Sequence, residues 1–124
     1  MTEKLREISV AGLAHIGDAV FELMVRTWLC TCGSSTAKTL HKQTVSFVSA
    51  RAQSSAAEKI LPHLSEDEAA VFKRGRNTQV NSIPKNATHE EYHAATGVET
   101  LFGYLYLGDQ VERLNFLFEL IVGE

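Results

Sequence analysis

The sequence predicts an all-α fold, a single domain over residues 1–124, and three observations predict it. Apolar residues recur at intervals of three and four residues in several long segments, which is the spacing of amphipathic helices. No segment shows the alternation of apolar and polar residues that a half-buried strand requires. Two capping boxes, in which Ser or Thr is followed three residues later by Glu, mark helix starts. We therefore expect helices packed on helices around one core.

The first expected helix spans residues 10–30. Its apolar positions form two adjacent stripes, Leu13, Ile16, Val20 and Leu23 in one and Gly17, Phe21, Met24 and Trp28 in the other. The run at residues 32–35 (Cys-Gly-Ser-Ser) ends it, and a second helix is expected to begin near Ser35 or Thr36. A third is expected from about Val45 to Leu61, because Pro62 cannot continue a helix.

The two capping boxes introduce the next helices. Ser65-x-x-Glu68 starts a helix expected to end at Gly75, and a polar loop follows over residues 77–86. Asn86 or Thr88 then opens a long helix to about Leu107, and Thr88-x-x-Glu91 favours Thr88. A last helix follows Gly108. Its inward face is expected to comprise Val111, Leu114, Leu117, Phe118 and Ile121.

The composition excludes several classes of protein. With 44% hydrophobic residues, the 124-residue chain can bury a core without disulfides or a structural metal. The N-terminus resembles no targeting signal, and no apolar run approaches the ~20 residues that span a bilayer. Cys30 and Cys32 are too few for a disulfide framework and lack the second ligand pair of a zinc site. We therefore expect a cytoplasmic protein with reduced thiols.

The net charge of −3 is unevenly distributed. No acidic residue occurs between Glu22 and Glu58, or between Glu68 and Glu90. The basic residues of these two segments are Arg26, Lys38, Lys42, Arg51, Lys73, Arg74, Arg76 and Lys85. Because local charge matters more to a polyanion than the total, these segments are candidates for nucleic-acid binding. Solvated surface that happens to lack acids is the equally open alternative.

Asp18 is a carboxylate on an apolar helix. It follows Gly17, and a glycine inside a helix, which costs ~1 kcal/mol relative to alanine, usually marks close approach by a backbone or a ligand. Asp18 also lies four and eight residues before Glu22 and Arg26. An exposed ion-pair stripe is therefore the alternative interpretation.

Glu99 lies in residues 94–107, which are apolar almost all round and should be buried. A buried lone carboxylate must be paired, protonated or bound to a metal. A local capping box, Thr96-x-x-Glu99, is the alternative, and the helix already running from Thr88 argues against it. Two carboxylates brought together from separate helices suit Mg²⁺. Such a site can activate water and stabilise the leaving oxygen of a phosphodiester.

Several motifs resemble the ribonuclease III family. Residues 17–23 (Gly-Asp-Ala-Val-Phe-Glu-Leu) resemble its signature helix, and residues 98–107 resemble its second acidic motif. The closer resemblance, over nearly the whole chain, is to the Mini-ribonuclease III group, which has the nuclease domain without the double-stranded RNA-binding domain. The segments that carry it are residues 14–20, 40–42, 48–53, 72–77 and 84–86.

The resemblance implies a ribonuclease III-type endonuclease that acts as a homodimer. It implies hydrolysis of double-stranded RNA with Mg²⁺, for which Mn²⁺ substitutes, in the maturation of large-subunit ribosomal RNA from precursor 23S RNA. Asp18 and Glu99 are the implied catalytic and metal-binding residues. Full-length ribonuclease III has acids where this chain has Ala14 and Thr96, and Mini-ribonuclease III resembles this chain in both respects. The number of protein ligands at each metal therefore stays open, with Glu22 as a further candidate.

A nuclease domain that holds the duplex by itself needs basic contacts to phosphates. We assign them to Lys73, Arg74, Arg76, Asn77, Lys85 and Asn86, with His41, Lys42 and Arg51 as weaker candidates. Arg76 and Asn77 are equally suited to capping a helix end. A two-fold dimer would give one acidic cluster per strand. Phe21, Met24 and Trp28 are its candidate interface, with ordinary burial as the alternative.

Two other functions stay open. A catalytically inactive RNA-binding subunit would explain Ala14 and Thr96, whereas Asp18 and Glu99 favour an enzyme. A helical protein-interaction domain would leave the two acid-free segments unexplained.

Overall fold

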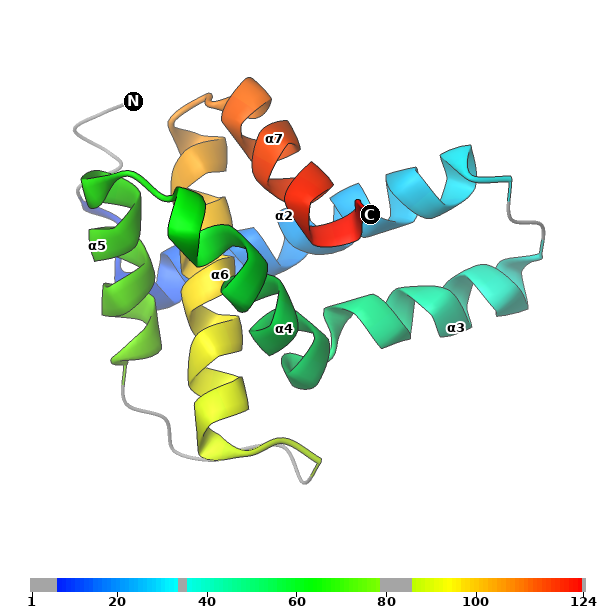
Figure 1. Cartoon of the computed structure of the whole chain (residues 1–124), viewed down its shortest axis with the longest axis horizontal. Helices are drawn as coiled ribbons and strands as arrows, with labels where there is room; N and C mark the ends of the chain where they lie inside the picture. Colours follow the sequence, from blue (N-terminus) through cyan, green and yellow to red (C-terminus); the bar gives the residue numbers. More distant parts are fainter. Residues whose placement is uncertain (1–6, 34–35, 79–85, 124) are drawn as a thin grey trace.

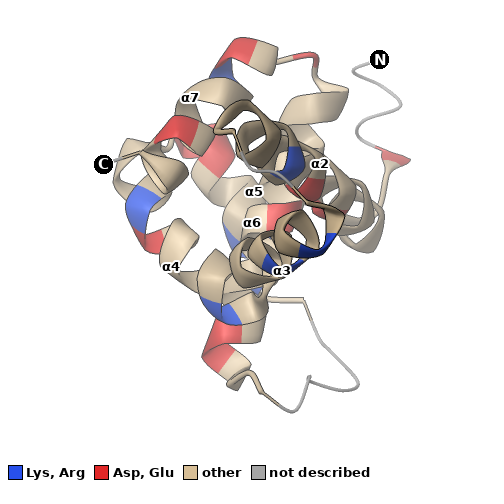
Figure 2. Cartoon of the chain, turned by 90° about the vertical axis from the view of Figure 1, so that its right-hand side faces the viewer, with Lys and Arg blue, Asp and Glu red and all other residues tan. Residues whose placement is uncertain are grey.

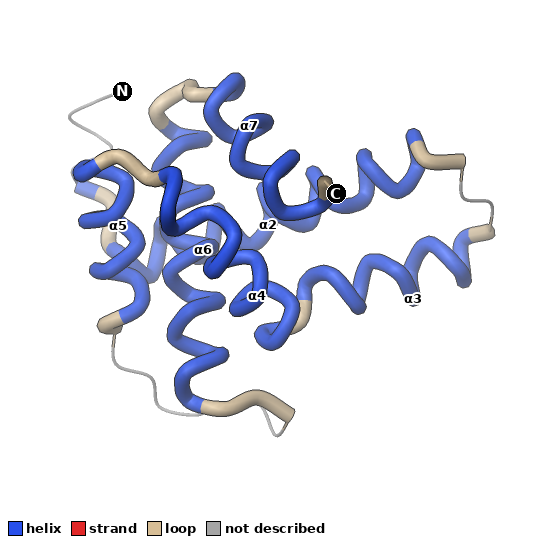
Figure 3. The backbone as a smooth tube through the Cα atoms, in the orientation of Figure 1, coloured by secondary structure: helices blue, strands red, loops and turns tan. Residues whose placement is uncertain are grey.

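The structure is a computed structural model that describes residues 7–33, 36–78 and 86–123. Its elements are α2 (Val10–Thr31), α3 (Ala37–Val48), α4 (Ala50–Ile60), the 3-10 helix η1 (Leu61–His63), α5 (Glu66–Arg76), α6 (His89–Leu107) and α7 (Val111–Val122). All regular structure in the described ranges is helical, as Figure 3 shows. The all-α prediction is confirmed.

Helix α6 lies at the centre of the molecule. It packs against α2, α4 and α5, and in Figure 1 α5 and α4 flank it while α2 crosses behind. Val98, Leu101, Phe102 and Leu105 of α6 are fully buried. Residues of α2, α4, α5 and α7 complete the same core. The nearly uniform apolar sequence of residues 94–107 is thus explained, because neighbours cover this helix on several sides.

Both capping boxes form as predicted. The Ser65 and Thr88 hydroxyls accept hydrogen bonds from the backbone N–H groups of Glu68 and Glu91. The two Glu side chains accept from the N–H groups of Ser65 and Thr88 in return. These reciprocal bonds satisfy N–H groups that the first helical turn leaves without partners. Thr88, rather than Asn86, is therefore the start of α6.

The expected third helix, from Val45 to Leu61, is wrong at its start. Helix α3 continues to Val48, and Ser49 leaves the helical conformation with φ −64° and ψ 157°. The Ser49 hydroxyl accepts a hydrogen bond of 3.2 Å from the N–H of Ala52 and so opens α4. The apolar spacing hid this break, because side chains before and after it pack against the same core.

Two expectations about individual side chains also change. Val111, expected to point inward, is the first residue of α7 and is 53% exposed, since the buried face of this helix begins at Leu114. The other four expected positions of α7 are buried. Phe21, a candidate for a dimer interface, is only 1% exposed and packs edge-on against Phe102. Ordinary burial is thus the correct interpretation of Phe21.

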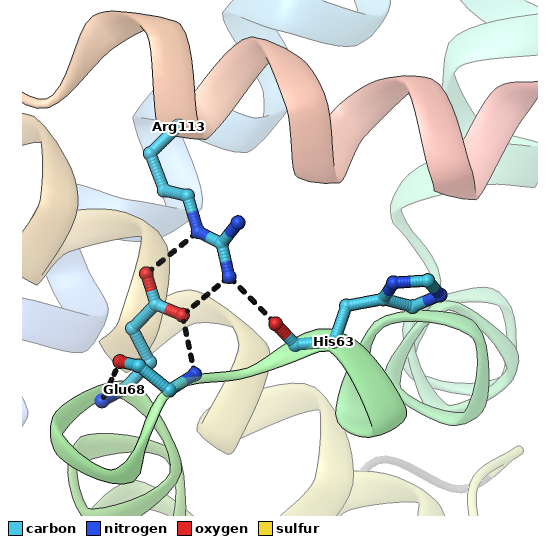
Figure 4. A network of polar contacts seen from close by, with 4 residues as sticks. His63, Glu68 and Arg113 are labelled. Carbon is cyan, nitrogen blue, oxygen red and sulfur yellow. Dashed lines mark hydrogen bonds and ion pairs between the residues drawn. The ribbon is translucent and has the colours of Figure 1, made fainter.

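A buried ion pair ties together α5, η1 and α7 (Figure 4). Arg113 of α7 donates to both carboxylate oxygens of Glu68 at 2.8 Å and to the His63 carbonyl at 2.6 Å. The hydrogen bond from Arg113 lowers the pKa of Glu68 although burial acts in the opposite direction. A charge that is only 6% exposed is therefore compensated.

Within the described ranges, no helix has the length and apolar character that a membrane crossing requires.

Candidate active site

Helices α2 and α6 cross where each carries a glycine. Gly17 faces the backbone carbonyl of Glu99, and Gly103 faces the backbone carbonyl of Leu13. A Cβ atom at either glycine would overlap these backbone atoms, which cannot move aside as a flexible side chain would. The close approach expected from the glycine inside α2 is thus an approach of two backbones. It brings Asp18, the residue after Gly17, beside Glu99.

The carboxyl groups of Asp18 and Glu99 lie close enough to interact electrostatically and to hydrogen-bond when one of them carries a proton. Burial raises the pKa of Glu99 from 4.5 to about 8, and the negative charge of Asp18 and the hydrogen bond to it act in the same direction. Asp18 is exposed and Glu99 is half-buried. At neutral pH and without a cation, the neutral form of Glu99 is therefore favoured.

Gln53 of α4 is a third member of this site, which we did not expect from the sequence. Its side chain is 1% exposed, and its Nε2 donates to Glu99 Oε2 at 3.3 Å and to the Val48 carbonyl at 3.0 Å. Both neighbours are acceptors, so the amide can present only its NH₂ group to them. The sequence did hold a signal, because Gln53 shares a helical face with Ala56, Ala57 and Ile60, which are all buried.

The pair fits a divalent cation. Two carboxylates from different helices offer oxygen ligands, and their mutual repulsion would be relieved by a bound positive ion. Asp18 lines a cavity of about 390 Å³ together with His15, Ala19, Glu22, Leu23 and Arg26. Residues 7–33, 36–78 and 86–123 hold no cluster of three or more metal-ligating side chains. Water and phosphate oxygens would therefore complete the coordination.

The alternative interpretations of the two acids are settled by their neighbours. Glu22 does pair with Arg26, at 2.7 Å, whereas Asp18 faces Glu99 instead of joining that stripe. Thr96 lies inside the continuous helix α6, and its hydroxyl donates to the Tyr92 carbonyl at 2.9 Å. The capping-box interpretation of Glu99 is therefore wrong.

Four of the stronger RNA-contact candidates, Lys73, Arg74, Arg76 and Asn77, lie at the end of α5. Lys73, Arg74 and Arg76 are exposed in its last turn and form no ion pair with another described residue. Asn77 caps α5, and its N–H donates to the Lys73 carbonyl at 2.9 Å. Asn86 is exposed, and Lys85 lies outside the described residues.

A cavity of about 430 Å³ lies between the end of α5 and the start of α6. It is lined by Arg76, Asn77, His89, Glu90 and His93. The imidazoles of His89 and His93 thus lie beside the guanidinium of Arg76. Neither histidine is among the RNA contacts expected from the sequence.

The weaker candidates lie on other elements. His41 and Lys42 are exposed on α3, which carries no acidic residue, and Arg51 is exposed in the first turn of α4. Figure 2 shows the basic segments of α3 in blue. His41 lines a cavity of about 320 Å³ with Arg26 of α2.

Comparisons with known proteins agree with this arrangement. Residues 11–110 match the family described as "Ribonuclease III domain". The chain is 44% identical to the Mini-ribonuclease 3 of Clostridium tetani over 97% of this chain and 80% of that protein. It is 42% identical to the Mini-ribonuclease 3 of a Thermoanaerobacter species over 97% of this chain and 84% of that protein.

A crystal structure of a Fusobacterium nucleatum protein superposes with a TM-score of 0.87 at 30% identity, over 96% of this chain and 97% of that chain. The family match covers both Asp18 and Glu99 and the glycine crossing between them. The chain therefore belongs to the ribonuclease III family, within its Mini-ribonuclease 3 group.

Proposed function

We propose that this chain is an endoribonuclease that hydrolyses phosphodiester bonds of double-stranded RNA with a divalent cation, Mg²⁺ or Mn²⁺ in its place. Membership of the ribonuclease III family supports the endoribonuclease class. The observation that carries the proposal is the pairing of Asp18 with Glu99 at the crossing of α2 and α6. Burial and the nearby Asp18 charge disfavour the ionised form of Glu99, and a divalent cation bound between the two carboxylates would compensate both effects.

Asp18 and Glu99 would hold the cation. When bound, the ion would supply a Lewis acid for activating water and stabilising charge on the leaving oxygen. Glu99 would release its proton as the ion binds, because a ligating carboxylate must be ionised. The glycine crossing holds the two backbones in contact, so the carboxylates need no rearrangement of the helices to meet.

Duplex RNA would be held through its phosphates. Double-stranded RNA is recognised mainly by shape, phosphates and 2′-hydroxyls, so exposed basic side chains that no carboxylate neutralises are suitable contacts. Lys73, Arg74 and Arg76 are exposed and form no ion pair with another described residue, so they are the first candidates. We assign Asn77 and Asn86 to the same surface, and His41, Lys42 and Arg51 to a second one. Lys85, which lies outside the described residues, remains a candidate contact from the sequence.

A homodimer is part of the proposal, because each chain offers one carboxylate pair and a duplex has two strands. The exposed apolar side chain of α2 is Leu23, which is 65% exposed. A hollow of about 440 Å³ lies next to it, lined by Leu23, Met24, Thr27, Trp28, Asn115, Phe118 and Glu119. Leu23, Met24 and Trp28 therefore form the self-complementary surface that we propose, without Phe21.

We further propose that this activity serves the maturation of large-subunit ribosomal RNA from precursor 23S RNA in the cytoplasm, the role that the resemblance to the Mini-ribonuclease III group implies. Cys30 and Cys32 are both free and exposed, which suits a reducing compartment.

A direct assay tests the proposed activity. Purified protein is incubated with a long RNA duplex, with each of its single strands, and with duplex DNA of the same sequence. Cleavage of the RNA duplex alone, in Mg²⁺ or Mn²⁺ and not in EDTA, is expected. Tight duplex binding without cleavage in either metal would instead favour the inactive RNA-binding subunit, the alternative that Ala14 and Thr96 suggest.

A further inference from the structure

Gln53 connects two helices of the core to the carboxylate pair. We propose that Gln53 is a positioning residue of the metal centre, which holds Glu99 in the orientation that receives the cation. This inference rests on the proposed function, because it assigns Gln53 a role in the site that Asp18 and Glu99 form. Gln53 itself is not proposed as a ligand.

The geometry of the amide supports this role. The Nε2 atom lies between two acceptors, the Val48 carbonyl at the end of α3 and Glu99 Oε2 on α6. One hydrogen bond anchors the amide to the backbone, and the other fixes one oxygen of Glu99. The orientation of Glu99 is thereby tied to the junction between α3 and α4.

The other two buried, uncharged polar residues of the described ranges, Thr44 and Thr100, differ from Gln53 in their hydrogen bonds. The hydroxyls of Thr44 and Thr100 donate to carbonyls of their own helices, at 2.8 Å and 2.7 Å. Gln53 instead reaches from α4 to α6, while its Oε1 is buried with no partner among the described residues. A residue kept for stability alone would not leave a buried acceptor unpaired. An apolar side chain of equal size at position 53 would fill the same space but could not donate a hydrogen bond to Glu99.

The chemical nature of Gln53 also suits a cation site. A lysine or arginine at this position would neutralise Glu99 and compete with the metal for it. A neutral amide donates a hydrogen bond to the carboxylate and leaves its negative charge available. Groups that hydrogen-bond to ligating carboxylates orient the ligand in this way.

Two variants of Gln53 test the proposal. Gln53→Met keeps the length of the side chain and removes the donor, and Gln53→Asn keeps the amide but shortens its reach by one methylene. Thr44→Val is the matched control, because it removes a buried polar group that bonds only within α3. Mn²⁺ affinity is measured by titrating the RNA-free protein, and thermal midpoints are recorded without metal.

We expect both Gln53 variants to bind Mn²⁺ roughly 10- to 100-fold more weakly than wild type and the control. Metal-free thermal midpoints should stay close to that of Thr44→Val. The metal concentration for half-maximal cleavage should rise in parallel, with the KM for RNA unchanged and the rate recovering at saturating Mn²⁺.

Wild-type Mn²⁺ affinity in a folded Gln53 variant would overturn the proposal and leave Gln53 a packing residue. If Gln53→Met does not fold, Gln53→Asn decides. Failure of the proposed function would look different, because wild type itself would then cut no duplex and would bind Mn²⁺ no better than Asp18→Asn.

Discussion

Glu99 lies half-buried on the central helix, with the carboxyl group of Asp18 within hydrogen-bonding distance. Folding removes part of its water and brings a like charge close, so the neutral form of Glu99 is favoured up to about pH 8. An ordinary core would not retain such a group. In the proposed function, a divalent cation bound between the two ionised carboxylates would offset their mutual repulsion.

The raised pKa of Glu99 predicts a pH dependence of stability. The unfolded chain releases this proton near 4.5 and the folded chain holds it to about 8. The folded state is therefore stabilised by its stronger hold on this proton, fully below about pH 4.5, and this contribution is lost as the pH rises through 8. In EDTA, the free energy of unfolding should fall between these values by at most ~1.4 kcal/mol per pH unit from this group. Chemical denaturation at several pH values measures it.

Glu99→Gln is the control for this titration, because it keeps the shape and removes the proton equilibrium. The free energy of unfolding of this variant should vary less with pH. In saturating Mg²⁺, the free energy of unfolding of wild type should rise with pH instead of falling, because the ionised carboxylates bind the cation. An unchanged pH slope in Glu99→Gln would show that another group is responsible.

The crossing of helices α2 and α6 determines where Asp18 and Glu99 meet. We expect Gly17→Ala to force the two helices apart and to cost about 3 kcal/mol, since the added Cβ meets backbone. Cleavage should fall with it, because Asp18 and Glu99 separate. Gly12→Ala, on the same helix, meets only the side chains of Ile8 and Ser9 and is the matched control. Equal stability of the two variants, measured in denaturant, would contradict the account.

The end of α5 gives a prediction about RNA binding. Each phosphate neutralised by a basic residue releases condensed counterions, so binding should weaken steeply with salt. Replacing Lys73, Arg74 and Arg76 by alanine should weaken binding to unrelated duplexes and flatten the salt slope by about one unit per lost contact. Cleavage at saturating RNA should change much less. Binding like wild type at every salt concentration would move the RNA path to Lys38, Lys42 and Arg51.

The helix boundaries that could be predicted are those with local causes. The capping boxes at Ser65 and Thr88 are sequence patterns that act within four residues, and both form. Ser49 was missed because a lone serine in a helical pattern does not reveal whether it caps or points to solvent. The ends at Thr31 and Leu107 follow from glycines and polar residues close by.

The candidate site was predictable only in part, for a physical reason. Asp18 and Glu99 stand out because each is a carboxylate on an apolar helix, and the family resemblance named them as a pair. Gln53 could not be joined to them, because the packing of α4 against α6 depends on tertiary contacts that no local pattern specifies. Phe21 and Leu23 are likewise both apolar residues of the same expected helix, and the sequence alone does not show which of them is buried in the core.

At the scale of the whole molecule, the exposed face of α2 predicts self-association. Leu23→Glu places a charge on the proposed dimer surface at a position that the monomer core does not need, since Leu23 is 65% exposed. Sedimentation should show a dimer for wild type and a monomer for this variant. Val111→Glu is the control, because Val111 is 53% exposed at the start of α7, where an acid suits the helix dipole. A wild-type monomer that cuts duplex RNA would contradict the dimer.

The pairing of Asp18 with Glu99 as one catalytic centre is the claim on which the account depends. The measurement that tests it most directly is duplex cleavage by Asp18→Asn and Glu99→Gln in saturating Mg²⁺, with duplex binding and metal-free stability recorded on the same samples. Each variant should lose cleavage by roughly a thousandfold or more while binding the duplex nearly as wild type does. Because each substitution relieves the repulsion between the two carboxylates, metal-free stability above neutral pH should not fall. Full cleavage by either folded variant would contradict the assignment of the centre.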